Sequence, residues 1–313
     1  MKTKVSLVIF SCLLSIPAMS ADLYVNATGV DGDCLARSPC ASIQAAINVS
    51  APGDSIHIAE GQYFENVTIP AGKNGLHISG AGESTKVISA GGDLVRKEAP
   101  IGVPIDVVFD IFATDTTIEK LSIEHPPGIP NKRDLGVFVR PPAQNTTIQK
   151  NSIKRNRTGS ALEPTRPGSR GVFVVQAKGV NISKNNFSGN YEDHLHIPSS
   201  NITIDKNNVV DAKRIGIVII QETPTSDSTN NMITNNTVLN SGADGIQIQG
   251  DENIIAKNAV VNSGGAGIRL CGAGDCVAPG ITAVASGNSV TKNELENNSA
   301  GNVVDNGSGN TVR

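Results

Sequence analysis

The hexapeptide Ile204-Asp-Lys-Asn-Asn-Val209 decides the fold, because its pattern recurs along most of the chain. An aliphatic residue is followed by two residues, an asparagine, one further residue and a second apolar one. Copies of the pattern, the first with Leu121 in the asparagine position, begin at Ile118, Ile148, Ile182, Ile204, Ile233, Ile255 and Val290. The spacing between copies is 22 residues or longer. Such a period indicates a solenoid in which each repeat forms one coil.

A second pattern lies between the copies, and it places a glycine before short aliphatic runs. It occurs at Gly136, Gly171, Gly216, Gly245 and Gly267. Each coil should therefore hold several short strands joined by turns, with the repeated asparagines stacked at one corner, where their amides can bond to neighbouring coils. The chain is predicted to be all-β, a parallel β-helix. A leucine-rich repeat would need leucines and helices, and a propeller would need a blade period.

The N-terminal part adds a capping helix and a family resemblance. Ser42 can cap a short helix whose apolar face includes Ile43 and Ile47. Residues 22–82 resemble the first coil of secreted right-handed parallel β-helix proteins, the pectin-lyase-like group. The resemblance implies a right-handed helix of about ten coils, with the short helix covering the open end of the stack. We expect one domain, 22–313.

The first 21 residues have the pattern of a signal peptide. Lys2 and Lys4 precede an apolar run from Val5 to Ile16, and small residues follow it. We expect cleavage near residue 21 and a secreted or periplasmic protein. The apolar run is too short to span a membrane, so no membrane span is predicted. The formal charge of −3 argues against nucleic acid as a partner.

Four cysteines remain after removal of the signal, and they form two close pairs in the sequence. In an exported protein the pairs Cys34–Cys40 and Cys271–Cys276 are predicted to be disulfides. The pairs lie far apart and neither has the C-x-x-C spacing of a zinc site. No cofactor or resident metal is predicted.

The longer spacings show where extra residues are inserted. They fall at 124–134, 157–169, 221–230 and 272–286, all beside the glycine-containing strands. The coil from Ile182 to Ile204 has no insertion. It should form the floor of a cleft whose walls are loops from neighbouring coils, which is where enzymes of this fold hold a sugar chain.

Strand alternation predicts which side chains line that cleft. The glycine position of the floor coil falls on His194, so Leu195 and Ile197 should fill the core, and His194 and His196 should both face outward. Aligned with His196 in the outward row are Phe138, Phe173, Val218, Gln247 and Arg269, and beside it lie Arg140, Arg170, Lys213 and Arg214. Aromatic rings and cations in one strip suit an anionic polysaccharide.

The stretch Tyr191-Glu-Asp-His194-Leu-His196, followed by Asn201-Ile-Thr-Ile204, resembles the mannuronan C5-epimerases and related uronate enzymes. Their sites carry Tyr-x-x-Asp-Pro-His before an Asn-x-Thr-Ile strand. The resemblance implies that Tyr191 and His196 are the acid and base that exchange the C5 proton of a uronate. His194 stands where the family has Asp, and Arg170 or Arg214 could neutralise the substrate carboxylate. The predicted activity is therefore β-elimination or epimerisation.

Other functions remain open at this point. The chain could be a non-catalytic carbohydrate-binding or surface protein. The H-x-H pair could bind Zn²⁺ or Cu²⁺ with Glu192 as third ligand, and some periplasmic β-helix proteins of copper-enzyme assembly are similar in repeat type. A glycosidase would need paired carboxylates such as Asp193 and Asp244. A row of lysines in the repeat could bind an anionic surface or simply favour solubility: Lys120, Lys150, Lys184, Lys206, Lys257 and Lys292.

Overall fold

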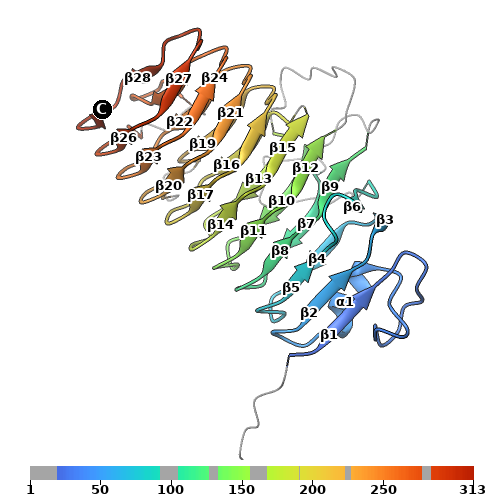
Figure 1. Ribbon diagram of the computed structural model, residues 1–313. Helices are drawn as coiled ribbons and strands as arrows, with labels where there is room; N and C mark the ends of the chain where they lie inside the picture. The colour runs from blue at the N-terminus through green and yellow to red at the C-terminus, as the bar shows by residue number, and fades with distance from the viewer. Residues whose placement is uncertain are drawn as a thin grey trace, which may run out of the picture.

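The computed structural model describes residues 20–91, 105–126, 133–155, 168–189, 191–222, 227–276 and 283–313. These form an elongated right-handed parallel β-helix, with the N-terminal coil at one end of the stack and the C-terminus at the other (Figure 1). The predicted fold is confirmed. The expected signal peptide lies almost entirely outside the described residues and stays a prediction.

Three sheets run the length of the stack, and each coil contributes a strand to most of them. The first sheet contains β1 (Asp22–Val25), β2 (Ser55–Ile58), β5 (His77–Ser79), β8 (Thr117–Glu119), β11 (Thr147–Gln149), β14 (Asn181–Ser183), β17 (Thr203–Asp205), β20 (Met232–Thr234), β23 (Ile254–Ala256), β26 (Ser289–Thr291) and β29 (Thr311–Val312). The second sheet contains β4 (Val67–Ile69), β7 (Ile105–Ile111), β10 (Arg133–Val139), β13 (Arg170–Val174), β16 (Asp193–Ile197), β19 (Ile215–Ile219), β22 (Ile246–Ile248), β25 (Ile268–Leu270) and β28 (Val303–Asp305). The third sheet contains β3 (Gly61–Phe64), β6 (Thr85–Ile88), β9 (Ser122–His125), β12 (Ser152–Arg155), β15 (Asn186–Gly189), β18 (Asn208–Val210), β21 (Thr237–Leu239), β24 (Ala259–Val261) and β27 (Glu294–Glu296).

The repeat sets the register of the stack. Its first aliphatic residues pair along the first sheet, as in Ile148 with Ile182 and Ile182 with Ile204. Its second apolar residues pair along the third sheet, as in Phe187 with Val209. These side chains are fully buried and fill the interior between the sheets. Because the same apolar position recurs in every coil, burial of one coil requires its neighbours.

The predicted asparagine stack is present at the corner between the first and third sheets. Asn207 Oδ1 accepts hydrogen bonds from the backbone N–H and the side-chain amide of Asn185, both at 3.0 Å. Asn207 in turn donates to Asn236 Oδ1. Each side chain thus satisfies backbone groups that the turn leaves unpaired. The ladder runs through Asn151, Asn185, Asn207, Asn236, Asn258 and Asn293.

A second asparagine ladder lies at the other end of the first-sheet strands, and the sequence interpretation missed it. It runs through Asn231, Asn253, Asn288 and Asn310. Each of these asparagines stands two residues before the aliphatic residue that starts a repeat, as Asn231 does before Ile233. This fixed spacing from the repeat could have predicted the second ladder from the sequence. The two ladders therefore connect the coils at both ends of the first-sheet strands.

The row of lysines in the repeat has a conformational role. Each lysine directly follows a first-sheet strand and has a left-handed φ between 54° and 58°. Asn235 occupies the same position in its coil, with φ of 55°. Asparagine adopts this conformation readily, whereas residues branched at Cβ do not.

Replacement of Lys257 by valine is expected to destabilise the protein by about 1–2 kcal/mol, because a β-branched side chain clashes in the left-handed region. Lys257→Asn should have almost no effect, since Asn235 already serves in this position. Urea denaturation of the two variants measures the difference. Equal stabilities would show that the turn conformation does not constrain the residue.

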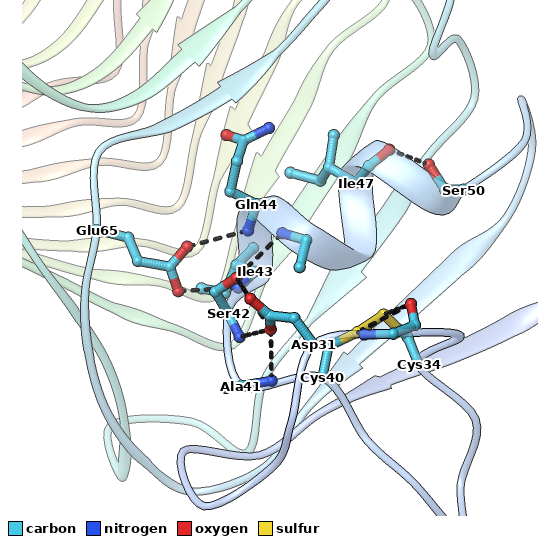
Figure 2. Close-up of a disulfide and its surroundings, with 12 residues drawn as sticks. Asp31, Cys34, Cys40, Ala41, Ser42, Ile43, Gln44, Ile47, Ser50 and Glu65 are labelled. Carbon is cyan, nitrogen blue, oxygen red and sulfur yellow. Dashed lines mark hydrogen bonds between the residues drawn. A yellow bond between two sulfur atoms is a disulfide. The ribbon is translucent and has the colours of Figure 1, made fainter.

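A short helix covers the N-terminal end of the stack, as predicted (Figure 1). It is α1 (Ile43–Val49), and Ser42 accepts a hydrogen bond from Ala45 N at its start. Figure 2 shows two carboxylates at the same end, with Asp31 accepting from Ala41 N and Glu65 from Ile43 N. Backbone N–H groups at the helix N-terminus therefore have hydrogen-bond acceptors within the protein.

Both predicted disulfides are present. Cys34–Cys40 lies beside α1 in the first coil (Figure 2), and Cys271–Cys276 closes a loop after β25. Each links cysteines only a few residues apart, so each fixes a local loop and not the stack as a whole. In the described part of the chain, no helix is long and apolar enough to cross a membrane.

Candidate functional site

His196 lies on β16, in the outward row of the second sheet that the sequence predicted. Phe173 and Val218 are its partners on the neighbouring strands. The register continues from Phe138 on β10 to Gln247 on β22. The predicted alignment of this row is confirmed, from Phe138 through Arg269.

Two carboxylates hold the ring of His196. Its Nδ1 lies 2.9 Å from Asp193 Oδ2, and its Nε2 lies 2.7 Å from Glu222 Oε1. Carboxylates only accept, so these two bonds require an N–H at both nitrogens and hence the imidazolium form. Arg170 Nη2 is 3.3 Å from the same Nε2, a contact that suits the neutral ring instead. Nε2 is thus the atom whose protonation depends on its neighbours.

The two predicted arginines complete the cluster. Arg214 donates to Asp193 Oδ2 at 2.6 Å, and Arg170 donates to Gly168 O at 2.7 Å. Within this cluster, the buried atoms Arg170 Nε, Arg214 Nε and Asp193 Oδ1 have no hydrogen-bond partner among the described residues. The cluster therefore retains unused donors and an unused acceptor.

The charges in the cluster set the pKa values of its acids. Burial alone would raise the pKa of Asp193, but the hydrogen bond and charge of His196 and the two arginines lower it to about 2. Burial would also raise the pKa of Glu222, but the hydrogen bond and charge of His196 and the charge of Arg170 lower it to about 2. Both groups are ionised across the physiological range.

Asp193 should make the free energy of unfolding depend on pH in the acidic range. An aspartate in an unfolded chain has a pKa near 3.9, whereas the pKa of folded Asp193 is about 2. The ionised group therefore stabilises the fold above about pH 4, and this contribution, on the order of 2 kcal/mol, is lost as the pH falls through about 2. Urea denaturation at a series of pH values should show this component in the wild type.

In Asp193→Asn the acid-dependent component should be missing. The exposed Asp211 provides the control, and Asp211→Asn should keep this component. If Asp193→Asn and the wild type lost stability in parallel down to pH 2, Asp193 would not be the paired group.

Apolar side chains border the cluster on the outer face of the sheet. The rings of Phe138 and Phe173 are stacked, with centroids 5.1 Å apart, and Phe173 lies edge-on to His196 at 5.4 Å. Phe138 and Phe173 belong to an apolar group separate from the main core. A third apolar group, which includes Val218, lies on the opposite side of His196. Apolar contacts therefore lie on both sides of the charged cluster.

The other predicted binding residues lie on or near this face but are already paired. Arg140 binds Asp110 through two hydrogen bonds of 2.6 and 2.7 Å. Arg269 binds Asp244 in the same way, at 2.7 and 3.0 Å. The amide of Gln247 donates to Cys276 O. Arg140 and Arg269, two of the cations that the sequence predicted on this face, are thus each neutralised by an aspartate.

The expectation that His194 faces outward is wrong. Its ring lies among the core side chains of Phe187 and Tyr191, its Nε2 bonds to Val210 O, and burial lowers its pKa to about 4. The glycine position faces the core, because a Cβ built on Gly171, which aligns with His194, would lie 3.0 Å from Phe187. Strict alternation therefore fails between His194 and Leu195, and His194 and His196 do not share a face. The proposed H-x-H metal pair is therefore not formed.

Tyr191 is also inside the helix. It is fully buried, and its hydroxyl lies 3.0 Å from His125 Nδ1 and 3.3 Å from Lys154 O. His125, to which the sequence assigned no role, is fully buried, and burial lowers its pKa. Tyr191 and His196 therefore lie on different sides of the sheet wall.

His125 also belongs to the group of residues best placed to hold a metal ion. Ligand atoms of Asp106, His125 and Asp134 lie within 4.8 Å of one another, and all three residues are buried. Asp106 already accepts from Ser89 Oγ at 2.6 Å, and Asp134 accepts from Arg155 at 2.7 Å. The arginine supplies the positive charge that a metal would bring, so these residues form a compensated internal network.

The predicted cleft walls fall mostly outside the described residues. Glu222 belongs to the insertion after β19, and its side chain reaches His196. A separate pocket of about 310 Å³ lies at the N-terminal coil, between Tyr24, His57 and Pro39. It is formed by different coils from the His196 cluster.

Comparisons with known proteins agree with this architecture. A family model described as a right handed beta helix region matches residues 108–232. No curated protein sequence matches the chain. The chain is therefore a right-handed parallel β-helix, as its resemblance to this group implied.

Particular solved structures share the fold. The A-module of a mannuronan C-5 epimerase from Azotobacter vinelandii is 13% identical, with a TM-score of 0.53 over 82% of this chain and 72% of its own. Pectin methylesterase from carrot is 12% identical, with a TM-score of 0.53 over 93% and 88%. The Dettilon tailspike protein is 18% identical, with a TM-score of 0.52 over 87% and 54%. At these identities the likeness establishes the fold alone.

Proposed function

We propose that this chain binds an acidic, uronate-containing polysaccharide on the outer face of the second sheet and cleaves it by β-elimination. The observation that carries the proposal is His196, held by buried Asp193 at Nδ1 and directed at Nε2 toward Arg170 and the half-buried Glu222. Two arginines beside a positioned histidine fit a carboxylate-bearing sugar whose C5 proton is removed. Buried apolar side chains on either side of His196 keep the cluster partly shielded from water.

The reaction needs one base on one face of the sugar. Once Nε2 is deprotonated and no longer bonded to Glu222, His196 takes the C5 proton on Nε2, while Nδ1–H continues to donate to Asp193. The electrons of the C5–H bond form the C4–C5 double bond, and the C4–O bond breaks. The leaving oxygen then receives the proton from Nε2, so proton and electrons balance without a cofactor. Arg170 stabilises the negative charge that develops on the substrate carboxylate.

The position of Tyr191 favours elimination over epimerisation. Epimerisation returns a proton to the opposite face of C5 and therefore needs a second group across the sugar. Tyr191 was the sequence candidate for that group, but it is buried with His125 inside the helix. One exchangeable proton on His196 is enough for elimination on a single face.

Purified protein should be incubated with alginate, pectate and a neutral glucan. Growth of ultraviolet absorbance from the C4–C5 double bond, with alginate or pectate only, is the expected result. Proton NMR of the recovered polymer detects epimerised residues in the same samples. Absence of unsaturated product from every uronate polymer would contradict the proposed reaction.

A non-catalytic carbohydrate-binding protein is the second candidate. The contact of Glu222 with His196 favours it, because a carboxylate 2.7 Å from Nε2 occupies the atom that would have to act as the base. Co-sedimentation with a uronate polymer without formation of product would support this function. Export of the protein, proposed from the N-terminal pattern, is consistent with the two disulfides.

A further inference from the structure

Glu222 approaches the cluster from the solvent side. Its side chain is 34% exposed, whereas those of its partners His196 and Arg170 are 3% and 10% exposed. Its Oε1 is 2.7 Å from His196 Nε2 and 3.7 Å from the Arg170 guanidinium. Because Glu222 reaches the buried guanidinium of Arg170 and the ring of His196 from outside, another carboxylate could occupy the same position.

The contact with Arg170 leaves hydrogen-bonding capacity unused. Arg140 and Arg269 each bind an aspartate through two hydrogen bonds of 3.0 Å or less. Arg170 instead lies 3.7 Å from one oxygen of Glu222, and its buried Nε has no partner. A carboxylate free to choose its orientation could make the stronger two-bond contact with the guanidinium.

Exchange of Glu222 for another carboxylate would also conserve charge. Asp193 is engaged by His196 Nδ1 and Arg214 and remains in place. Loss of Glu222 alone would leave the positive charge of Arg170 without its outer counter-charge. An incoming carboxylate restores that charge at the same position.

We propose that the Arg170 guanidinium, beside His196, forms a carboxylate-binding position, that Glu222 fills it in this structure, and that the carboxylate of a ligand displaces Glu222. The identity of the ligand as a uronate rests on the proposed function, but the binding position does not. Glu222 then acts as an internal competitor. Because only the fraction of molecules with Glu222 displaced can bind, its removal must tighten carboxylate binding.

Sodium acetate is the simplest probe of this position. In Glu222→Ala, acetate should raise the melting temperature above its value in sodium chloride of equal ionic strength, and it should bind at least about tenfold more tightly than to the wild type. Asp227→Ala, which removes an exposed acid from the same insertion, should behave as the wild type. The double variant Glu222→Ala/Arg170→Ala should lose the response to acetate.

Glu222→Gln guards against a folding defect, since it keeps the shape and loses the charge. It should also bind acetate more tightly than the wild type. An equal response to acetate in the wild type and both Glu222 variants, or retention of the response in the double variant, would overturn the inference.

A second arm uses oligogalacturonate and separates the inference from the proposed function. Tighter acetate binding without any binding of the oligouronide would leave the carboxylate position intact and contradict the polysaccharide ligand. Oligouronide binding that is equally strong with and without Glu222 would support the ligand and contradict the competition.

Discussion

His196→Ala is expected to lower the rate of β-elimination on a uronate polymer by roughly 10²- to 10⁴-fold, the usual contribution of a positioned general base. The variant removes the only group of the described cluster that can both accept the C5 proton and return it to the leaving oxygen. Its neighbours Asp193 and Glu222 have pKa values of about 2 and are poor bases. Initial rates of product absorbance measure the loss.

Two controls separate catalysis from structure in this experiment. His77→Ala removes a half-exposed histidine of the first sheet and should leave the rate unchanged. His196→Asn keeps a side chain that can donate to Asp193 but supplies no base, so it should fold as the wild type and remain inactive. Wild-type activity in His196→Asn would exclude His196 as the base.

Asn207→Ala should produce the largest loss of stability, about 3 kcal/mol or more. Asn207 Nδ2 donates to Ile182 O at 2.8 Å, and its Oδ1 accepts from Asn185 N at 3.0 Å. Alanine leaves both of these buried backbone groups unsatisfied, and each such group costs about 1–3 kcal/mol. Urea denaturation should show a lower midpoint.

The next residue provides a matched control for the asparagine ladder. Asn208 is the same residue type, one position further on, but its side chain is exposed. Asn208→Ala should change the free energy of unfolding by no more than about 0.5 kcal/mol. Similar losses for Asn207→Ala and Asn208→Ala would show that the ladder does not stabilise the stack.

The fold could be predicted because its determinants repeat. Ile182, Ile204 and Asn207 each recur at a fixed place in a coil, and parallel stacking places equal positions side by side. The same regularity predicted that Phe173, His196 and Val218 would be neighbours, although 22 or more residues separate them in the sequence. Register transfers directly from sequence to structure in a solenoid.

The site could be predicted only where it follows the repeat. Arg170 and Arg214 were expected beside His196, and they lie there. Glu222 could not be placed, because it belongs to an insertion whose path is not set by the coil. His194 was misplaced because the glycine position faces the core, as does the next residue. Alternation cannot predict such a departure, and Tyr191 packs against His194 in the interior.

The outward row of the second sheet places equivalent residues at a regular spacing along this face. Phe138, Phe173 and His196 stand on consecutive coils, so adjacent side chains are separated by the strand spacing of about 4.8 Å. A polymer lying parallel to the axis of the stack would pass one coil for each step of that length. Insertion or deletion of one whole coil between Phe173 and His196 would therefore move the reacting position along the polymer by one step of that length, without altering either residue.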